Sequence, residues 1–466
     1  MKARRTGGMR GGLALQPPPA APRAPQAVAP PAPVSAGDAA AGILPGDLLV
    51  PPKVLWQRMQ WTVVFAGFLL YVFVATTYQL RVGDIAVAVA LFGLLLQREP
   101  FRFPRFLIWF AVFLLWCAVG YLTTRYPISV WNSLDTLFRV FLITLVAVNA
   151  LRTRDQVRLF IVFWVLCFAL YPARGAILNY LGGYTHFGRA LWNFIYSNPN
   201  DLAALTLLQL SLATGLLVTE PKGIFRFGAL GAVIVLPIVI LLTQSRAVFL
   251  GLALFGVLAL LVNRQRLRTL ALLLVLGLAI LFTVPSSTWE RFGGLRFATN
   301  RETLRAVDKE GSAEQRFQIW ETALAIIRDH PITGVGFGAY PQAHFEYAPV
   351  AVDRGINLGK RDTHSTYLNV TAAVGFPGLL VFLGLVAAPL VYAERVRRRV
   401  REWAPRRAQQ LFFLEVGLLG FLVAGIFASY AKLSFLYLHL ALIFAVASVL
   451  EREHAEAGGV SAPAAR

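Results

Sequence analysis

The sequence predicts an all-α, polytopic membrane protein, and two observations support this fold class. Hydrophobic residues make up 57% of the 466 residues and charged residues 15%, whereas a soluble domain is usually about 45–50% apolar and about 25% charged. The apolar residues also form blocks of roughly 17–20 residues, long enough for a helix to cross a bilayer core of about 30 Å. Disorder is excluded for most of the chain, because its signature is low hydrophobicity.

Twelve apolar blocks are candidate transmembrane helices. Their approximate bounds are 59–80, 83–97, 106–123, 132–150, 157–172, 200–218, 224–242, 247–263, 267–285, 365–394, 410–429 and 432–450. Two outer connecting segments are long, 173–199 and 286–364. Connections longer than about 12–15 residues are usually functional or disordered, so a site is expected near these segments.

The chain accordingly divides into five parts. These are a disordered tail rich in Pro and Ala (1–52), spans one to nine (53–285), a large, partly helical outer loop (286–364), spans ten to twelve (365–450) and a second tail (451–466). The composition of the first tail does not favour a packed core.

Basic residues outnumber acidic ones, with 44 Lys and Arg against 24 Asp and Glu and a net charge of +20. Such an excess can indicate a nucleic-acid partner, but most of these arginines lie in short joints between apolar blocks, where membrane topology selects them. With the N-terminus inside, the joints after even-numbered spans are cytoplasmic and carry Arg98, Arg102, Arg105, Arg152, Arg154, Arg158, Lys222, Arg226, Arg264, Arg266, Arg268 and a cluster from Arg395 to Arg407. The short outer joints carry Arg81, Arg125, Arg246 and Lys432. We therefore predict cytoplasmic termini and no nucleic-acid partner.

The two cysteines, Cys117 and Cys167, each lie inside an apolar block. This placement indicates neither a disulfide framework nor a thiolate metal site. No pair of His, Cys, Asp or Glu residues has metal-ligand spacing, so we predict no structural metal.

An amphipathic helix is predicted from Ala313 to His330, inside the second long outer segment. Apolar residues recur at helical spacing at Phe317, Trp320, Leu324 and Ile327, and Pro331 ends the helix. Such a helix is expected to lie at the outer membrane–water boundary and to cover what is beneath it. The alternative is a helix packed on the outer mouths of the spans.

Two arginines at the outer boundary are candidate ligands for a phosphate or pyrophosphate. Arg246 follows Thr243-Gln244-Ser245 in the tight turn between spans seven and eight, and Arg316 lies one turn before Trp320. Arginine offers a planar fork of donors and keeps its charge. The alternatives are a side chain that reaches lipid headgroups for Arg246, and a solvated or cation–π residue for Arg316.

His364 is a candidate general base, in the segment Asp362-Thr363-His364-Ser365 that enters span ten. Asp362 or Thr363 can cap that helix, and a histidine in the first turn feels the positive end of the helix dipole, which disfavours imidazolium. A neutral imidazole is what a general base requires. Asp362 acts on the pKa in the opposite direction, and a structural, hydrogen-bonded histidine is the alternative.

Three further residues bear on function. His186 and Arg189 lie in the first long outer segment and are candidate substrate-binding residues, with a purely structural role as the alternative for His186. Arg139 lies inside span four, four residues after Asp135, so we expect an ion pair within that helix.

The Gly334-Val335-Gly336-Phe337-Gly338 segment follows a helix rather than a strand, so it predicts a chain-redirecting turn rather than a phosphate loop.

Taken in order, several stretches resemble the bacterial O-antigen ligase and O-antigen polymerase superfamily. They are Ser197-Asn198-Pro199-Asn200-Asp201-Leu202-Ala203, Gln244-Ser245-Arg246-Ala247, Arg316 to Trp320, His330-Pro331-Ile332-Thr333-Gly334-Val335-Gly336-Phe337-Gly338, His364-Ser365-Thr366-Tyr367-Leu368 and Gly375-Phe376-Pro377-Gly378. The resemblance covers about 59–450. In this superfamily the histidine is often followed by Asn, whereas this chain has Ser365.

The resemblance implies a multi-pass glycosyltransferase of the GT-C type in the bacterial inner membrane, with loop 286–364 and the active site on the periplasmic face. Its donor is a glycan on undecaprenyl pyrophosphate, its acceptor is the lipid A core or another glycan, and membrane lipids surround it. No cofactor, nucleotide sugar or divalent metal is implied. By motif, Arg246 and Arg316 hold the pyrophosphate and His364 activates the acceptor hydroxyl.

The physical argument agrees with that chemistry. Guanidinium groups stabilise the charge that develops on a pyrophosphate leaving group, and a base takes the proton of the incoming hydroxyl. A direct in-line attack inverts the anomeric centre, and no outer carboxylate stands out in the sequence as a nucleophile. We therefore expect inversion without a covalent glycosyl-enzyme.

Transfer to the lipid A core is the first hypothesis, and polymerisation of repeat units is the second. The third is a transporter or flippase, which often shows an inverted repeat with broken spans at the midplane. No such pairing is evident in the sequence, and the candidate residues lie at the outer boundary. A scaffold protein without catalysis is the fourth.

Overall fold

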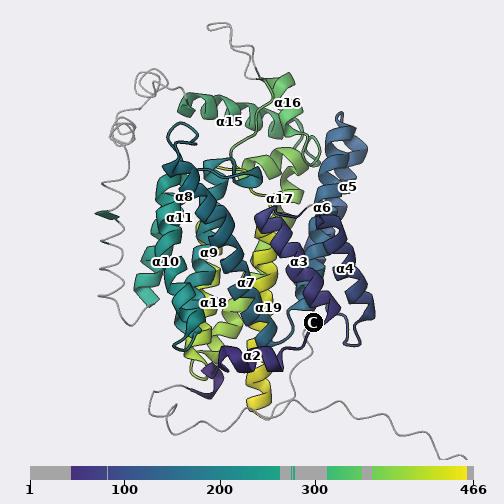
Figure 1. Cartoon of the computed structure of the whole chain (residues 1–466). Helices are drawn as coiled ribbons and strands as arrows, with labels where there is room; N and C mark the ends of the chain where they lie inside the picture. Colours follow the sequence, from purple (N-terminus) through teal and green to yellow (C-terminus); the bar gives the residue numbers. More distant parts are fainter. Residues whose placement is uncertain are drawn as a thin grey trace, which may run out of the picture.

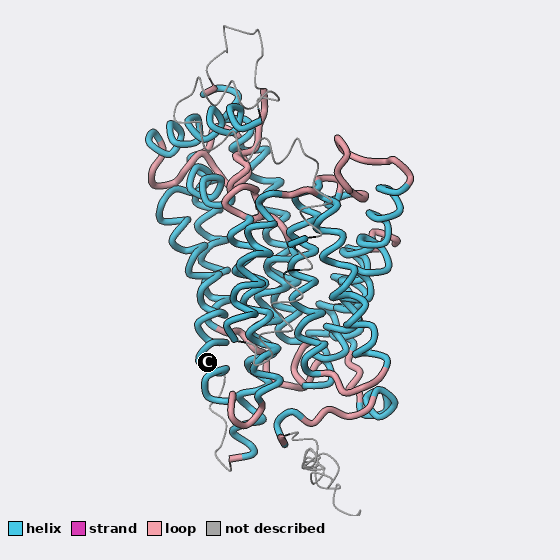
Figure 2. Tube along the Cα trace, turned by 90° about the vertical axis from the view of Figure 1, so that its left-hand side faces the viewer, coloured by secondary structure: helices cyan, strands magenta, loops and turns pink. Residues whose placement is uncertain are grey.

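The computed structural model describes residues 44–80, 82–262, 274, 277–278, 312–348 and 359–458. Within these ranges the chain is helical and contains no strand, apart from an isolated bridge between His186 and Arg189. Most helices run side by side as one bundle, with α2 (Pro52–Arg58) across one end and α15 (Ser312–Asp329) across the other (Figure 1). Figure 2 shows the same arrangement from the side. We call these two ends the α2 end and the α15 end.

Eight helices within the described ranges are long and apolar enough to cross a membrane. They are α5 (Arg105–Thr123), α6 (Pro127–Ala150), the continuous α7–α8 unit (Arg154–Leu181), α9 (Pro199–Thr219), α10 (Ile224–Thr243), α17 (Thr366–Val400), α18 (Pro405–Ala424) and α19 (Ser434–Ala457). Three shorter apolar helices accompany them, α3 (Val63–Thr77), α4 (Gly83–Leu96) and α11 (Arg246–Val262). The predicted fold class, an all-helical multi-pass membrane protein, is confirmed.

The predicted spans coincide with these apolar helices except for the ninth. That block, 267–285, lies almost wholly outside the described residues, so a total of twelve spans stays a prediction. Also outside the described residues are 286–311 and 349–358 of the predicted outer loop and most of the predicted N-terminal tail. What was predicted for them stays a prediction. The predicted C-terminal tail overlaps α19, which continues to Ala457.

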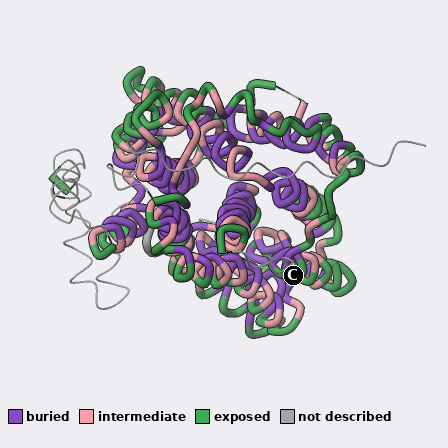
Figure 3. The backbone as a smooth tube through the Cα atoms, turned by 90° about the horizontal axis from the view of Figure 1, so that it is seen from below, coloured by how far each residue is buried: buried purple, intermediate pink, exposed green. Residues whose placement is uncertain are grey.

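The core is formed by α9, α18 and α19. Of the residues in the most apolar stretch of each of these helices, 83%, 78% and 89% are buried. In α5 and α10 the buried share is 33%. Viewed along the bundle, buried residues lie toward the middle and exposed residues around the outside (Figure 3). The outer helices therefore have an exposed apolar face, as expected where lipid replaces water as the solvent.

The α7–α8 unit shows how the sequence sets helix limits. Thr153 and Gln156 form a reciprocal capping box at the start of α7 (Arg154–Phe168). The π-helical turn η2 (Ala169–Ala173) contains Pro172, which has no backbone N–H for a regular helical hydrogen bond. The chain continues as α8 (Arg174–Leu181) to the α15 end.

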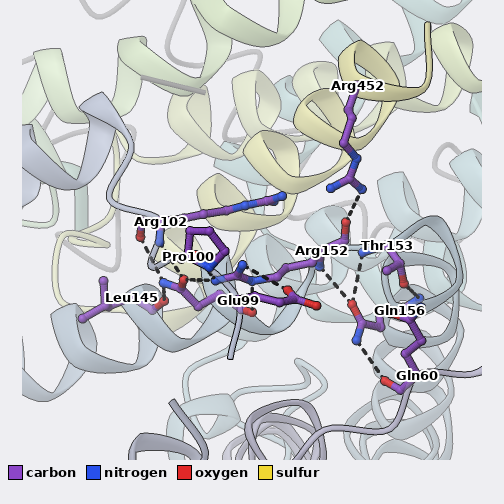
Figure 4. Close-up of polar contacts among 10 residues, drawn as sticks. Gln60, Glu99, Pro100, Arg102, Leu145, Arg152, Thr153, Gln156 and Arg452 are labelled. Atoms are coloured by element: carbon purple, nitrogen blue, oxygen red, sulfur yellow. Dashed lines mark hydrogen bonds and ion pairs between the residues drawn. The ribbon is translucent and has the colours of Figure 1, made fainter. Parts of the chain in front are cut away.

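Arginines at the α2 end are held in polar networks. In Figure 4, Arg152 donates from Nη2 to the carbonyl oxygen of Pro100 at 2.8 Å and pairs through Nη1 with Glu99 at 3.0 Å. Arg452 donates from Nη2 to the carbonyl oxygen of Arg152 at 2.5 Å. These contacts join the segment before α5, the start of α7 and the end of α19.

Residues 44–52 belong to the predicted N-terminal tail, but they pack against the α2 end. The short helix η1 (Pro45–Asp47) places the carboxylate of Asp47 at the start of α18, where it accepts from the backbone N–H groups of Arg406 and Arg407 at 3.0 and 3.1 Å. Arg158 donates to the carbonyl oxygen of Val50 at 2.5 Å. Residues that precede the first apolar helix are therefore packed against the bundle.

The predicted amphipathic helix is present as α15, but its buried face is shifted. Ile319, Ala323 and Ile326 are buried with Ile327 against α16 (Tyr340–Tyr347) and α17, whereas Phe317 is 50% exposed and Leu324 56% exposed. Phe317 and Leu324 therefore do not lie on the face that packs against the bundle. The buried face matches the alternative of a helix packed on the mouths of the spans.

The Gly334–Gly338 segment is a packed turn, as predicted. The backbone N–H groups of Val335 and Gly336 donate to carbonyls of α17 at 3.0 and 2.9 Å. These carbonyls are available because α17 is broken at Gly375, which has a positive φ of 71° and lies against Ile332. A side chain at Gly375 would clash with that backbone, so the close approach requires glycine.

Candidate active site

A two-residue turn positions Arg189 at the α15 end. His186 and Arg189 exchange backbone hydrogen bonds around Phe187 and Gly188, both of which have positive φ. Arg189 then donates from Nε to the carbonyl oxygen of Thr243 at 2.8 Å, at the end of α10. The loop after α8 is therefore attached directly to the turn that precedes Arg246.

That turn is itself built with a strained residue. Gln244 has a φ of 51°, and its side chain donates to the carbonyl oxygen of Gly188 at 3.1 Å. Ser245 Oγ donates to Oδ1 of Asn200 at 2.9 Å, and α11 then begins at Arg246. Left-handed backbone at a non-glycine residue is costly and concentrates at functional sites.

The three arginines Arg189, Arg246 and Arg316 are close enough to interact electrostatically. Burial, and after it the positive charges of Arg316 and Arg246, lower the pKa of Arg189 from 12.5 to about 10. Arg189 remains protonated at neutral pH, so three like charges converge there. Such an arrangement is unfavourable by itself and favours an anion with several negative oxygens.

His364 interacts with one of these charges, that of Arg316. Burial lowers its pKa below 6.5, Asp362 acts to raise it, and Arg316 and Arg361 lower it. The two opposing influences that the sequence left open are therefore resolved in favour of neutral imidazole. The helix dipole is not the main cause, because Ser365 rather than Asp362 or Thr363 caps α17 and His364 precedes the cap.

The backbone around His364 is fixed from two sides. His364 has a φ of 48°. Trp320 Nε1 donates to the carbonyl oxygen of Thr363 at 2.9 Å, and the Thr363 hydroxyl lies 3.0 Å from that of Ser429. Arg316 lies one turn before Trp320 on α15, so this contact holds the helix of that arginine against the segment that contains His364.

Sequence reasoning missed four residues near this group. Asn200 and Asp201 entered the sequence analysis only within a stretch that carries the family resemblance, although Asp201 lies close enough to Asp362 for their charges to interact. Tyr430 donates to the carbonyl oxygen of Asn200 at 3.3 Å. Lys432 donates to Ser133 at 3.0 Å, and Asp362 raises its pKa against the stronger effect of burial, which lowers it. These residues come from two separate segments, 200–201 and 430–432, so no local spacing links one pair to the other.

His186 is the candidate that the structure sets apart. Its side chain is exposed, and its ring packs edge-on against that of Phe187 at a centroid distance of 4.6 Å. His186 lies in the same turn as Arg189, but its ring lies at the exposed tip of that turn, beside Phe187. Its role in substrate binding stays a prediction. In the described ranges, no group of three His, Cys, Asp or Glu residues is placed to hold a metal ion.

Comparison with known families adds a second line of evidence. Residues 230–383 match a family model described as O-antigen ligase. Over this segment the chain is similar to O-antigen ligases. The matched segment contains Arg246, Arg316 and His364.

Two further similarities were found. Residues 55–198, which include Arg189, match a family of unknown function (DUF5935). An uncharacterized protein of Haemophilus influenzae is 25% identical over 131 residues. That match covers 28% of this chain and 33% of the relative, so the chain spans about a third of the relative's length.

Proposed function

We propose that the protein transfers a glycan from undecaprenyl pyrophosphate to an acceptor hydroxyl, and that the acceptor is the lipid A core. The observation that carries this proposal is that Arg316 interacts electrostatically with both Arg189 and His364, and that Arg246 also interacts with Arg189. The family match supports O-antigen ligase or polymerase chemistry. Repeat-unit polymerisation of O-antigen or exopolysaccharide is the alternative, because it uses the same donor and the same reaction.

The three arginines bind the pyrophosphate of the donor. When the bond between the anomeric carbon and the pyrophosphate oxygen breaks, the electron pair stays on that oxygen. Fixed guanidinium donors stabilise this developing charge without reorganising at the moment of reaction, and such electrostatic terms are often the largest in catalysis. The anchoring of Arg189 on Thr243 and Asn200 provides this rigidity.

His364 takes the proton of the acceptor hydroxyl. As the acceptor oxygen attacks the anomeric carbon, its proton passes to the imidazole, and undecaprenyl pyrophosphate leaves from the opposite face. The configuration at the anomeric carbon is therefore inverted. A base of this kind contributes about 10²- to 10⁴-fold to the rate, and the lowered pKa of His364 supplies the unprotonated form at neutral pH.

The α15 end faces the periplasm in this proposal, and both termini lie in the cytoplasm of a bacterial cell. The support is the distribution of charge. Arginines concentrate at the α2 end, including those around Arg152 and Arg407, and cytoplasmic ends of spans carry an excess of Lys and Arg. The donor's pyrophosphate would then meet the enzyme at the outer surface of the inner membrane.

The test is deletion of the gene in its host, followed by complementation with wild type, His364→Ala or His454→Ala at matched membrane expression. His454 packs on Trp403 at the α2 end and serves as the control. Lipopolysaccharide is visualised by silver staining, and undecaprenyl-linked glycan is extracted from the membrane. Full-length glycan stranded on undecaprenyl pyrophosphate with a bare lipid A core in His364→Ala supports the ligase.

Other outcomes separate the alternatives. Accumulation of single repeat units in His364→Ala identifies a polymerase instead. A His364→Ala strain that matches wild type in both measurements contradicts the assigned base and leaves a transporter, flippase or scaffold. The His454→Ala strain is expected to match wild type in every case.

A further inference from the structure

The half of α6 nearer the α15 end has a row of exposed polar side chains, which we call the polar stripe. Asn132, Asp135, Thr136 and Arg139 follow the spacing i, i+3, i+4, i+7, which places them within about a 100° arc of the helix. All four are exposed, whereas Val130 and Leu137 on the opposite side are buried. A helix surface that faces lipid is expected to be apolar. Exposed polar side chains are therefore unexpected on this face of α6.

Charged groups lie within the stripe. Arg139 pairs through Nε with Asp135 at 3.0 Å and through Nη1 with Asp84 of α4 at 2.7 Å. The Asp135 pair agrees with the ion pair predicted within the helix. The side chains of Arg139, Asp135 and Asp84 are 56%, 49% and 89% exposed, and together they carry a net charge of −1.

The depth of the stripe is fixed by the Arg139–Asp84 contact. Arg139 is twelve residues from Pro127 at the start of α6, about 18 Å at 1.5 Å per residue, and the whole helix has 24 residues. Asp84 is the second residue of α4. The start of α4 therefore lies near the middle of α6, and the half of α6 nearer the α15 end extends beyond it. Figure 1 shows α5, the neighbour of α6, reaching well above α4.

Charged side chains at this depth are expensive in hydrocarbon, and they almost always face water or a polar partner. The ion pairs reduce this cost, but the high exposure of Asp84 and Asp135 leaves carboxylate oxygens open to further hydrogen bonds. The stripe therefore borders water or a hydrogen-bonding ligand rather than acyl chains.

A buried side chain of α6, outside the stripe, is linked to the candidate active site. Ser133, next to Asn132 on α6, accepts a hydrogen bond from Lys432 at 3.0 Å. The charge of Lys432 interacts with that of Asp362, which in turn acts on His364. The helix that carries the stripe therefore also carries a residue that polar groups link to the proposed base.

We propose that this stripe forms one wall of a water-accessible recess that opens sideways to the membrane and binds the sugar head of an amphiphilic acceptor. The acceptor's hydrocarbon tail stays in the lipid. This proposal rests on the proposed glycosyl transfer and adds an acceptor site to it. Carboxylates, an amide and a hydroxyl match the many O–H groups of a sugar, whereas the net negative charge and the doubly paired Arg139 disfavour a pyrophosphate.

Cysteine accessibility tests the recess. The two native cysteines, both free and buried, are replaced by alanine to remove background. Asn132→Cys and Thr136→Cys are compared with Phe138→Cys and Leu115→Cys, which replace exposed apolar residues at similar depth. The protein is placed in lipid nanodiscs and treated with a charged, membrane-impermeant methanethiosulfonate, which reacts with the thiolate and therefore needs water.

We expect the cysteines at 132 and 136 to react at least tenfold faster than those at 138 and 115. Equal rates at all four positions overturn the recess, and so does slow reaction at all four, which indicates a stripe covered by protein or lipid. The labelling needs no turnover, so it is repeated with His364→Ala. Fast labelling of an inactive protein separates failure of the transfer proposal from failure of the recess.

The ligand class is tested by protection. Dodecyl maltoside, below its critical micelle concentration, is compared with a polyoxyethylene ether of the same C12 chain. We expect the maltoside to slow labelling at 132 and 136 severalfold and the ether to leave it unchanged. Equal protection by both amphiphiles, or protection by neither, overturns a sugar-binding recess.

Discussion

Arg189 donates a hydrogen bond from Nη2 to Oδ1 of Asn200 at 2.7 Å. The same oxygen accepts from Oγ of Ser245, next to Arg246. One amide oxygen in the first turn of α9 therefore joins two of the three arginine-bearing segments. Asn200 contributes no charge of its own, but it sets where two charges lie.

Replacing Asn200 with alanine is expected to lower kcat/KM about 10- to 100-fold. Hydrogen bonds to charged groups contribute about 1.5–3 kcal/mol, and each 1.4 kcal/mol is a factor of ten. The loss should appear mainly as a higher KM for the lipid-linked donor, measured on reconstituted protein. Asn193→Ala, an exposed amide in the same loop, is the control. A donor KM equal to that of wild type would show that Asn200 does not position the arginines.

Substitution of Arg316 by lysine is expected to reduce activity by about 10- to 10³-fold, even though the charge is kept. Lysine is a point charge and lacks the planar fork that matches phosphate oxygens, and loss of one fixed donor has an effect of about this size in other enzymes. Arg328→Lys, an exposed arginine on the same helix, should leave activity unchanged. Full activity in Arg316→Lys would mean that the site requires charge alone.

The sequence was sufficient to predict most of the fold. Apolar blocks located the membrane helices, because a helix surrounded by lipid must satisfy its backbone internally. The face of α15 was harder to predict. Ala323 is small and Ile319 falls between the chosen positions, yet both are buried, while the larger Phe317 and Leu324 are exposed. Helical spacing fixes which residues share a side, and the neighbouring helices decide which side is covered.

The site was predicted in part for a similar reason. Arg246, Arg316 and His364 were identifiable because charged groups at the ends of spans are expensive and local motifs surround them. Asn200, Tyr430 and Lys432 were not, because their contribution comes from contacts with distant segments. Asn200 and Ser245 are 45 positions apart in the sequence, and their 2.9 Å contact appears only in three dimensions.

Loss of the Asp47 carboxylate should destabilise the α2 end without affecting catalysis. Asp47 accepts from two backbone N–H groups at the start of α18. Asp47→Ala removes both partners and is expected to lower stability by about 1–3 kcal/mol, seen as a lower midpoint of thermal unfolding in detergent. Asp47→Asn keeps one acceptor oxygen and should lose less. Equal midpoints for wild type and Asp47→Ala would show that residues 44–52 do not contribute to stability.

The pH dependence of kcat/KM should report the protonation of His364. Its pKa lies below 6.5, so the base is neutral at pH 7 and activity is expected to fall as the pH decreases through that pKa. Arg361→Gln removes a positive charge that lowers the pKa, so the acid limb should move to higher pH. Asp362→Asn removes a negative charge that raises it, so the limb should move to lower pH. Lys360→Gln removes the same charge as Arg361→Gln one residue away and is the control. Opposite shifts in the two variants identify His364 as the titrating group, whereas coincident profiles assign the acid limb to another group.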